Sequence, residues 1–297
     1  MTVWIVGACT GNDGDMPELG EFPPAAHLGR ELHIAHRLPA ADRIVLTIPV
    51  VPEVLDDDGT IAREVLTTVL DEATGFVAVY ASLPDWGSTA SLAMRFAPVP
   101  IEARGQVVVD GRVVKAGKRL VFVEAVARWD GHPDRPIVAL ASGEFAKVGR
   151  RGDNLTMDLP PPDPDQVFAM GLEGSALGVP YRERLGLRVV DGPGGIVELP
   201  FTDYVRNSSG ILHGGVVGAL AVASVEAAAG ERVTDAHVQY LSAGRHGPFR
   251  TSVERLDAVG TGRLWRTQTF DVGGGTGGDS PGHLMTRATA TTASITP

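Results

Sequence analysis

The sequence predicts an α+β protein in which the same order of elements occurs twice. In each half a strand-like region leads through a glycine-containing turn into a long helix, and several strands follow. The first helix is predicted over residues 61–80, where apolar side chains recur every four residues and form one wide stripe. The second follows the turn at 207–215 and continues through an Ala-, Gly- and Val-rich stretch to about residue 229. Consecutive strands after a helix favour an antiparallel sheet packed on that helix.

The elements of the first half can be placed from their residue patterns. Residues 28–54 alternate as a strand does, most clearly at 43–50. The segment 56–60 is rich in Asp and contains Gly, so it is predicted as a turn that also caps the following helix. Later strands are predicted at 88–98, 105–114, 118–129 and 136–148.

The second half repeats this order after a Pro-dense stretch. A strand is predicted before the helix at 185–199, and strands follow it at 234–241, 249–258, 263–272 and 283–295. Gly59 and Gly210 align at the two turns. We therefore predict an N-terminal domain over 1–148, a linker over 149–180 and a C-terminal domain over 181–297. Two unrelated α+β domains are the alternative.

Composition limits the classes of function. The chain has 297 residues, 43% of them hydrophobic and 21% charged, as expected for a soluble globular protein. Its formal net charge of −10 argues against a nucleic-acid-binding protein. A single cysteine, Cys9, excludes an internal disulfide and a multi-cysteine metal site. The sequence shows neither a long apolar run nor a basic leader-like start, so we expect a cytoplasmic protein without a membrane partner.

Both predicted helices are poor in charge, which predicts that their own sheets wrap around them. From residue 65 to 83 the only carboxylates are Asp71 and Glu72, and no Lys or Arg is present. Asp71 shares its helix face with small residues, so a carboxylate there would be poorly solvated and would remain basic. An ordinary surface acid is the alternative interpretation.

The start of the second helix carries His213, Gly214 and Gly215. Two glycines at a helix start let an acyl carbonyl approach the backbone closely, and the N–H groups and helix dipole favour a negative oxygen there. This pattern fits an oxyanion hole, in which one donor is worth about 3–4 kcal/mol in the transition state. A glycine-containing loop with a packed histidine is the alternative.

At these residues the chain resembles the hotdog-fold acyl-CoA thioesterases, in the group typified by the phenylacetic-acid-pathway and 4-hydroxybenzoyl-CoA thioesterases. The family pattern is an Asn, five residues, then His-Gly, and an acid nine residues after the His. The second half supplies Asn207, His213 and Gly214. Val222 stands where the family has the acid.

The first half carries the complementary set. In the same register it has Asp56, Ala62 and Arg63 where the family has Asn, His and Gly, but it keeps the acid as Asp71. The family also has a Ser or Thr about eighteen residues after the acid, and Thr89 matches. Because hotdog sites form between two units, the resemblance implies one complete composite site and one that has lost its parts.

The resemblance also implies roles for these residues. The Gly214 N–H would polarise the thioester carbonyl. Asp71 would act as a general base on water or attack directly to give an anhydride. Thr89 would hold the water or the acid. Asn207 and His213 would shape the turn or contact the thioester.

The implied fold is a tandem double hotdog: two curled antiparallel sheets, each wrapped around a central helix, packed as an internal pseudo-dimer. The implied partner is a small-molecule acyl-CoA without a cofactor, and a homo-oligomer of such chains is compatible with the family. The residues expected to contact the substrate are Gly215, Ser88, Arg263 and Arg119, the two arginines through the CoA phosphates. For the arginines, solvated hairpin charges are the alternative. Two other functions stay open, a hotdog enoyl-thioester hydratase or dehydratase and a non-catalytic acyl-CoA-binding regulator.

Three further patterns predict no site. Residues 273–278 fit G-x-G-x-x-G, but no helix follows, so a flexible loop is expected. His27, His33 and His36 have no carboxylate at a ligand spacing, so no metal site is expected. Neither a G-x-S-x-G motif nor a Cys/His pair supports a serine or cysteine hydrolase.

Overall fold

The computed structural model describes residues 22–149, 162–259, 262–273 and 282–294 of the chain. The helices described are α1 (Leu28–Glu31), α2 (Arg63–Ser82), α3 (Tyr181–Arg184) and α4 (Gly214–Ala229), with a 3-10 turn at Pro52–Val54. The first strands are β1 (Ala35–Ala40), β2 (Arg43–Pro49), β3 (Trp86–Phe96), β4 (Gln106–Ala116), β5 (Leu120–Trp129) and β6 (Ile137–Val148). The later strands are β7 (Phe168–Ala169), β8 (Arg188–Asp191), β9 (Ile196–Leu199), β10 (Arg232–Tyr240), β11 (Phe249–Val259), β12 (Gly262–Asp271) and β13 (His283–Ala293).

These strands form one antiparallel sheet in the order β7-β1-β2-β4-β5-β6-β3-β10-β13-β12-β11-β9-β8. Outward from the junction of β3 with β10, one side runs β3-β6-β5-β4-β2 and the other runs β10-β13-β12-β11-β9. Each side therefore has the same order of strands relative to its own long helix. At the junction Arg95 lies opposite Asp235, and Ser91 lies opposite Gln239. The two halves of the chain share one continuous sheet.

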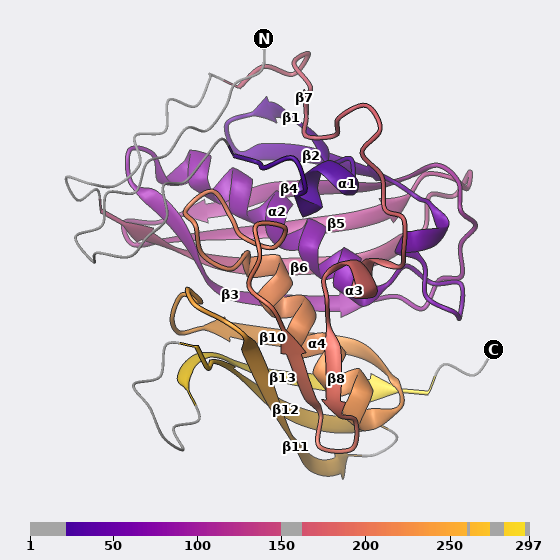
Figure 1. Cartoon of the computed structure of the whole chain (residues 1–297). Helices are drawn as coiled ribbons and strands as arrows, with labels where there is room; N and C mark the ends of the chain where they lie inside the picture. The colour runs from indigo at the N-terminus through magenta and orange to yellow at the C-terminus, as the bar shows by residue number, and fades with distance from the viewer. Residues whose placement is uncertain (1–21, 150–161, 260–261, 274–281, 295–297) are drawn as a thin grey trace.

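Each long helix packs against the strands of its own half (Figure 1). Helix α2 contacts β2 to β6, and α4 contacts β9 to β13. Val65, Val69 and Ala73 of α2 have no exposed surface, and neither has the polar Thr67. This burial explains why the body of the helix carries so few charges, because a charged side chain without a partner is costly inside a protein.

The two turns that precede the long helices have the same geometry. Gly59 and Gly210 both have a φ of +73°, in the left-handed region that favours glycine. The Gly59 N–H donates to the Asp56 carbonyl at 2.9 Å, and the Gly210 N–H donates to the Asn207 carbonyl at 3.0 Å. The predicted alignment of these two glycines agrees with this geometry.

Helices α2 and α4 are in direct contact through glycines of α4. A Cβ atom on Gly215 would lie 2.7 Å from the Cα of Thr68, and a Cβ on Gly218 would lie 2.7 Å from the Cγ2 of Thr67. Both distances are shorter than carbon atoms approach without strain, so only glycine lets the two helices come this close. The glycines at the start of α4 therefore serve helix packing.

Replacing Gly215 by Ala is expected to lower the free energy of unfolding by about 1–3 kcal/mol, the usual cost of overpacking. The loss is expected although alanine favours a helix more than glycine does, because the added methyl group meets the backbone of Thr68. Urea unfolding followed by circular dichroism measures it. Gly178→Ala is the control, since a Cβ there would meet nothing within 4 Å. An equal loss in both variants would contradict this account of the packing.

The region before α2 differs from the prediction. Residues 28–31 form α1 instead of a strand, because the buried His27 caps this short helix by accepting the Gly29 N–H. The expected strand is the β1–β2 hairpin at 35–49. The turn at 56–60 does not cap α2, because Asp58 accepts hydrogen bonds from Thr60 within the turn and the helix begins without a side-chain cap.

Two later segments also differ. The strand predicted at 185–199 is the β8–β9 hairpin, because Gly195 has a positive φ of +60° and lies in the turn between two short strands. The linker adds β7 to the sheet, beside β1. Cys9, residues 150–161 and most of the loop at 273–278 lie outside the described residues. In the described part of the chain no helix is long and apolar enough to cross a membrane.

Candidate active site

Asp71 of α2 lies beside the first peptide of α4. A Cβ atom on Gly214 would be 2.8 Å from Asp71 Oδ2, so the carboxylate and the glycine are in contact. Asp71 is buried, with 6% of its surface exposed. The Thr89 hydroxyl donates to its Oδ1 at 3.4 Å, and the nearby Gly215 N–H favours the charged form of the carboxylate. Residues from the two halves of the chain thus meet at one place, as a composite site requires.

The Gly214 N–H is available to a substrate. Gly214 is the first residue of α4, and the leading N–H groups of a helix have no acceptor within it. Across the described ranges this N–H has no acceptor in other residues either. The Tyr240 hydroxyl donates to the Gly214 carbonyl at 3.0 Å and fixes the residue in place. A carbonyl oxygen placed here would meet a free donor at the positive end of α4.

His213 connects the two helices at this site. Its Nδ1 accepts the Gly215 N–H at 3.1 Å, and its Nε2 lies 2.9 Å from Glu72 Oε2. Because Nδ1 is an acceptor, we assign the proton to Nε2, which donates to Glu72. Nδ1 also lies 3.8 Å from Asp71 Oδ2. The imidazole therefore lies between two carboxylates of α2.

The two carboxylates differ in basicity. Burial raises the pKa of Asp71 to about 6, against the opposing effect of His213. Burial alone would also raise the pKa of Glu72, but the hydrogen bond and charge of His213 bring that pKa below its ordinary value. For His213, burial acts to lower the pKa, and Glu72 and Asp71 together raise it. Asp71 is thus the more basic carboxylate, as suits a general base working near neutral pH.

The site opens into a cavity of about 330 Å³. Six of the predicted site residues line it: Asp71, Ser88, Thr89, Asn207, His213 and Gly214. The other three do not. Gly215 is turned toward Thr68, Arg119 lies between β4 and β5, and Arg263 lies 3.2 Å from Glu231.

The place of Arg263 follows from the strand register. It lies opposite Thr292 on β13, whereas Met285, near the other end of β13, lines the cavity. At about 3.3 Å per residue, the length of the strand separates them. The expected contact of Arg263 with CoA phosphates is therefore not supported at this cavity. Arg119 differs, because its carbonyl accepts the N–H of Lys147, which lies opposite Gly87 of the cavity wall, so its contact with a CoA phosphate stays a prediction. The sequence marks a charged hairpin but not which end of the sheet carries the site.

Asn207 shapes the turn before α4. Its side-chain Oδ1 accepts the N–H groups of Ser209 at 2.9 Å and Ile211 at 3.3 Å. The amide oxygen is thus engaged by the backbone in an Asx-type turn. Asn207 also lines the cavity, so contact of its side chain with a thioester stays a prediction.

Sequence reasoning assigned no role to Glu72 or Tyr240. Glu72 was visible as the only other carboxylate within residues 65–83, which is an unusual residue to keep in a buried helix. Tyr240 carried no local signal, because its contact with Gly214 depends on the path of β10 beside α4.

The three histidines before α2 have packing and hydrogen-bonding roles. His27 Nε2 lies 3.0 Å from the Arg206 carbonyl, and His33 contacts the Ser175 carbonyl. The His36 ring packs against Phe76, with ring centroids 4.2 Å apart. Within the ranges that the structure describes, no group of three or more His, Cys, Asp or Glu side chains could hold a metal ion.

Solved structures with the same architecture cover most of this chain. A TesB protein from Mycobacterium avium subspecies paratuberculosis is 14% identical, with a TM-score of 0.54 over 88% of this chain and 95% of that one. A 12:0-ACP thioesterase from Umbellularia californica is 10% identical, with a TM-score of 0.56 over 84% and 93%. A protein from Alicyclobacillus acidocaldarius described as having a hotdog fold is 11% identical, with a TM-score of 0.51 over 86% and 94%. These similarities show a hotdog fold.

A family model matches the second half of the sequence. Residues 204–293 match the acyl-CoA thioesterase N-terminal domain, a segment that contains the turn, α4 and strands β10 to β13. Over this segment, which is less than half of the chain, the sequence matches the acyl-CoA thioesterase family, and the fold of the chain is a hotdog fold. A comparison with curated protein sequences found no match.

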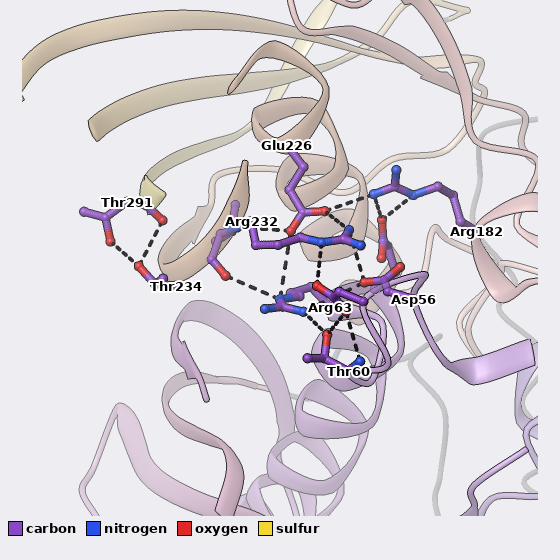
Figure 2. Close-up of polar contacts among 11 residues, drawn as sticks. Asp56, Thr60, Arg63, Arg182, Glu226, Arg232, Thr234 and Thr291 are labelled. Atoms are coloured by element: carbon purple, nitrogen blue, oxygen red, sulfur yellow. Dashed lines mark hydrogen bonds and ion pairs between the residues drawn. The ribbon is translucent and has the colours of Figure 1, made fainter. Parts of the chain in front are cut away.

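The chain has a second turn of the same kind, at the start of α2 (Figure 2). Here Arg63 is the first helical residue, as Gly214 is in α4, and Asp56 stands where the other turn has Asn207. The Arg63 side chain is 2% exposed and lies 3.9 Å from Asp56 and 4.0 Å from Glu226 of α4. An arginine side chain thus occupies the region that holds a free N–H in the other half.

Two more arginines, Arg182 and Arg232, pair with acidic residues around Arg63. We call this network of buried and half-buried charged side chains the arginine cluster; its members are Asp56, Asp58, Arg63, Glu64, Arg182, Glu226 and Arg232. Arg232 lies 3.2 Å from both Asp56 and Glu226, and Arg182 lies 3.2 Å from Glu226. Burial, with the charge of Glu64, raises the pKa of Glu226 to about 7 and that of Asp56 to about 6. The arginine cluster ties α2, α3, α4 and β10 together.

Proposed function

We propose that this protein is a thioesterase that hydrolyses an acyl-CoA at one composite site between its two halves. The observation that carries this proposal is the contact of Asp71 with Gly214, whose N–H is free. We also propose a tandem double hotdog, with domains 1–148 and 181–297 joined by the linker 149–180 and packed as an internal pseudo-dimer. The order of strands outward from the β3–β10 junction and the two matching turns support this arrangement.

In the proposed reaction the thioester carbonyl oxygen accepts the Gly214 N–H, which stabilises the oxyanion. Asp71 removes a proton from water as the water oxygen bonds to the carbonyl carbon. Collapse of the tetrahedral intermediate breaks the carbon–sulfur bond, and the proton held by Asp71 passes to the CoA thiolate. Thr89 orients the carboxylate, and His213 fixes the start of α4. The products are a carboxylic acid and free CoA.

Direct attack by Asp71 on the carbonyl, giving an anhydride, would use the same contacts. A single turnover in water enriched in heavy oxygen separates the two routes. General-base catalysis places the label in the released acid alone. In the nucleophilic route, water that attacks the Asp71 carbonyl of the anhydride places the label in the carboxylate of Asp71, and the released acid then carries an unlabelled oxygen from Asp71. Mass spectrometry of the digested protein detects the labelled Asp71, which identifies this route.

The contact of His213 with Glu72 favours one second candidate, a hydratase acting on an enoyl thioester, because such enzymes use a His/Glu pair. The test offers the purified chain a series of saturated acyl-CoAs and an enoyl-CoA. Release of free thiol supports the hydrolase. Hydration of the enoyl-CoA without thiol release supports the hydratase, and binding without either reaction supports a regulator.

The pH dependence of kcat/KM is expected to follow the ionisation of Asp71. A base must be unprotonated to accept a proton, and the pKa of Asp71 is about 6. Below that pH we expect kcat/KM to fall by about tenfold per pH unit, and above it to level off. Initial rates over a pH series, with folding checked at each pH by circular dichroism, measure this. A profile that stays flat through the pKa of Asp71 would contradict its role as the base.

A further inference from the structure

Gly75 lies on α2 one turn beyond Asp71 and lines the same cavity. Residues four apart share a helix face, and the helix rise places Gly75 about 6 Å further along the axis. Val79, one turn further again, also lines the cavity. Phe145 of β6 and Trp86 of β3 form part of the wall beside this stretch. The cavity thus follows α2 away from the reacting carboxylate along an apolar wall.

Among the described residues, packing does not require a glycine at position 75. A Cβ there would have one neighbour within 4 Å, Phe145 Cε1 at 3.6 Å, which is an ordinary contact. Gly215 and Gly218 differ, because their added Cβ atoms would collide with α2. Gly75 lies within a helix, where glycine is unfavourable relative to alanine. What the missing side chain does provide is open space beside Asp71.

In α4, the position that corresponds to Gly75 carries a side chain, that of Glu226. Glu226 lies four residues after Val222, as Gly75 lies four residues after Asp71. Its carboxylate accepts the Val233 N–H at 3.0 Å and joins the arginine cluster (Figure 2). One half therefore fills this position with a buried side chain, and the half with the acid leaves it empty.

We propose that Gly75 is a specificity-determining residue that lets an unbranched apolar acyl chain run along α2 from Asp71 past Gly75 toward Val79. This inference rests on the proposed hydrolysis at the composite site. A larger side chain at 75 blocks the chain after its first few carbons, and a larger side chain at 79 blocks only longer chains. The two positions act as successive stops on one path.

The experiment compares kcat/KM for acetyl-, butyryl-, octanoyl- and dodecanoyl-CoA in the wild type, Gly75→Ala, Gly75→Leu and Val79→Phe. Gly75→Leu is expected to retain activity on acetyl-CoA relative to the wild type and to lose about tenfold or more on octanoyl- and dodecanoyl-CoA. Val79→Phe is expected to lose the longest chain selectively. Gly75→Ala is the control for folding, with a higher melting temperature expected because alanine favours the helix.

An equal loss for all four substrates in Gly75→Leu and Val79→Phe would overturn the inference, because damage to the fold does not depend on acyl length. If Gly75→Leu does not fold, Val79→Phe and Gly75→Ala still test the inference. It holds if their loss of kcat/KM relative to the wild type increases with acyl chain length, and it fails if the loss is the same for every chain length. If the wild type hydrolyses none of the substrates, the proposed function fails. Calorimetric binding of the same series to these variants then tests the acyl path by itself.

Discussion

Replacing Asp71 by Asn is expected to lower kcat by about a hundredfold or more, the usual contribution of general acid–base catalysis. The amide has nearly the shape of the carboxylate, so its oxygen can still accept the Thr89 hydroxyl. It cannot accept a proton from water. Steady-state hydrolysis of the best acyl-CoA substrate measures the loss, and the melting temperature shows whether the fold is intact.

Val222→Ala is the matched control for the Asp71 variant. Val222 occupies the same position in α4, is 1% exposed and touches no part of the proposed reaction. Removing two buried methyl groups costs stability, but we expect kcat to stay near that of the wild type. A properly folded Asp71→Asn protein with unchanged kcat would eliminate the composite site.

Arg63→Met is expected to lower the free energy of unfolding by about 3–5 kcal/mol, the typical cost of removing one partner from a buried ion pair. The change leaves Asp56 and Glu226 buried with less positive charge nearby. Both acids already have raised pKa values, of about 6 and about 7. A raised acid pKa means that the folded state binds protons more tightly than the unfolded chain, so stability falls as pH rises through these values. The loss should therefore be larger at pH 8, above both pKa values, than at pH 5, below both.

Arg95→Met is the control for this measurement. Arg95 pairs with Asp235 across the β3–β10 junction, but its side chain is 79% exposed. Exposed pairs contribute about 0–1 kcal/mol, so this variant should unfold almost as the wild type does. Guanidinium unfolding at two pH values gives both results. If Arg63→Met loses no more stability than Arg95→Met, the arginine cluster does not stabilise the fold.

The main elements of the fold could be predicted because their signals are local. The four-residue period of Val65, Val69 and Ala73 marks α2, and alternation marks the strands that follow it. Alternation alone does not show where a chain reverses, so the β1–β2 and β8–β9 hairpins were each predicted as one strand. The cap of α1 by His27 was missed because it joins a histidine to a helix of a single turn.

The site could be predicted where one register relates the two halves. The spacing that pairs Asn207 with Asp56 also assigns Gly214 and Asp71 to complementary halves, and the structure brings those two residues into contact. The arginine cluster could not be predicted in this way. A buried Arg63 needs carboxylates from α4, and their approach depends on how the two helices cross, which no local pattern records.

The β3–β10 junction unites two halves whose long helices begin with the same backbone turn but carry different side chains there. In a dimer of identical subunits every substitution appears twice. A residue that improves one of the two symmetric sites is therefore also present at the other site, where it can reduce stability or activity. A single polypeptide escapes that constraint. Gly214 can remain small beside Asp71 while Arg63 forms buried ion pairs at the matching position, and neither requirement compromises the other.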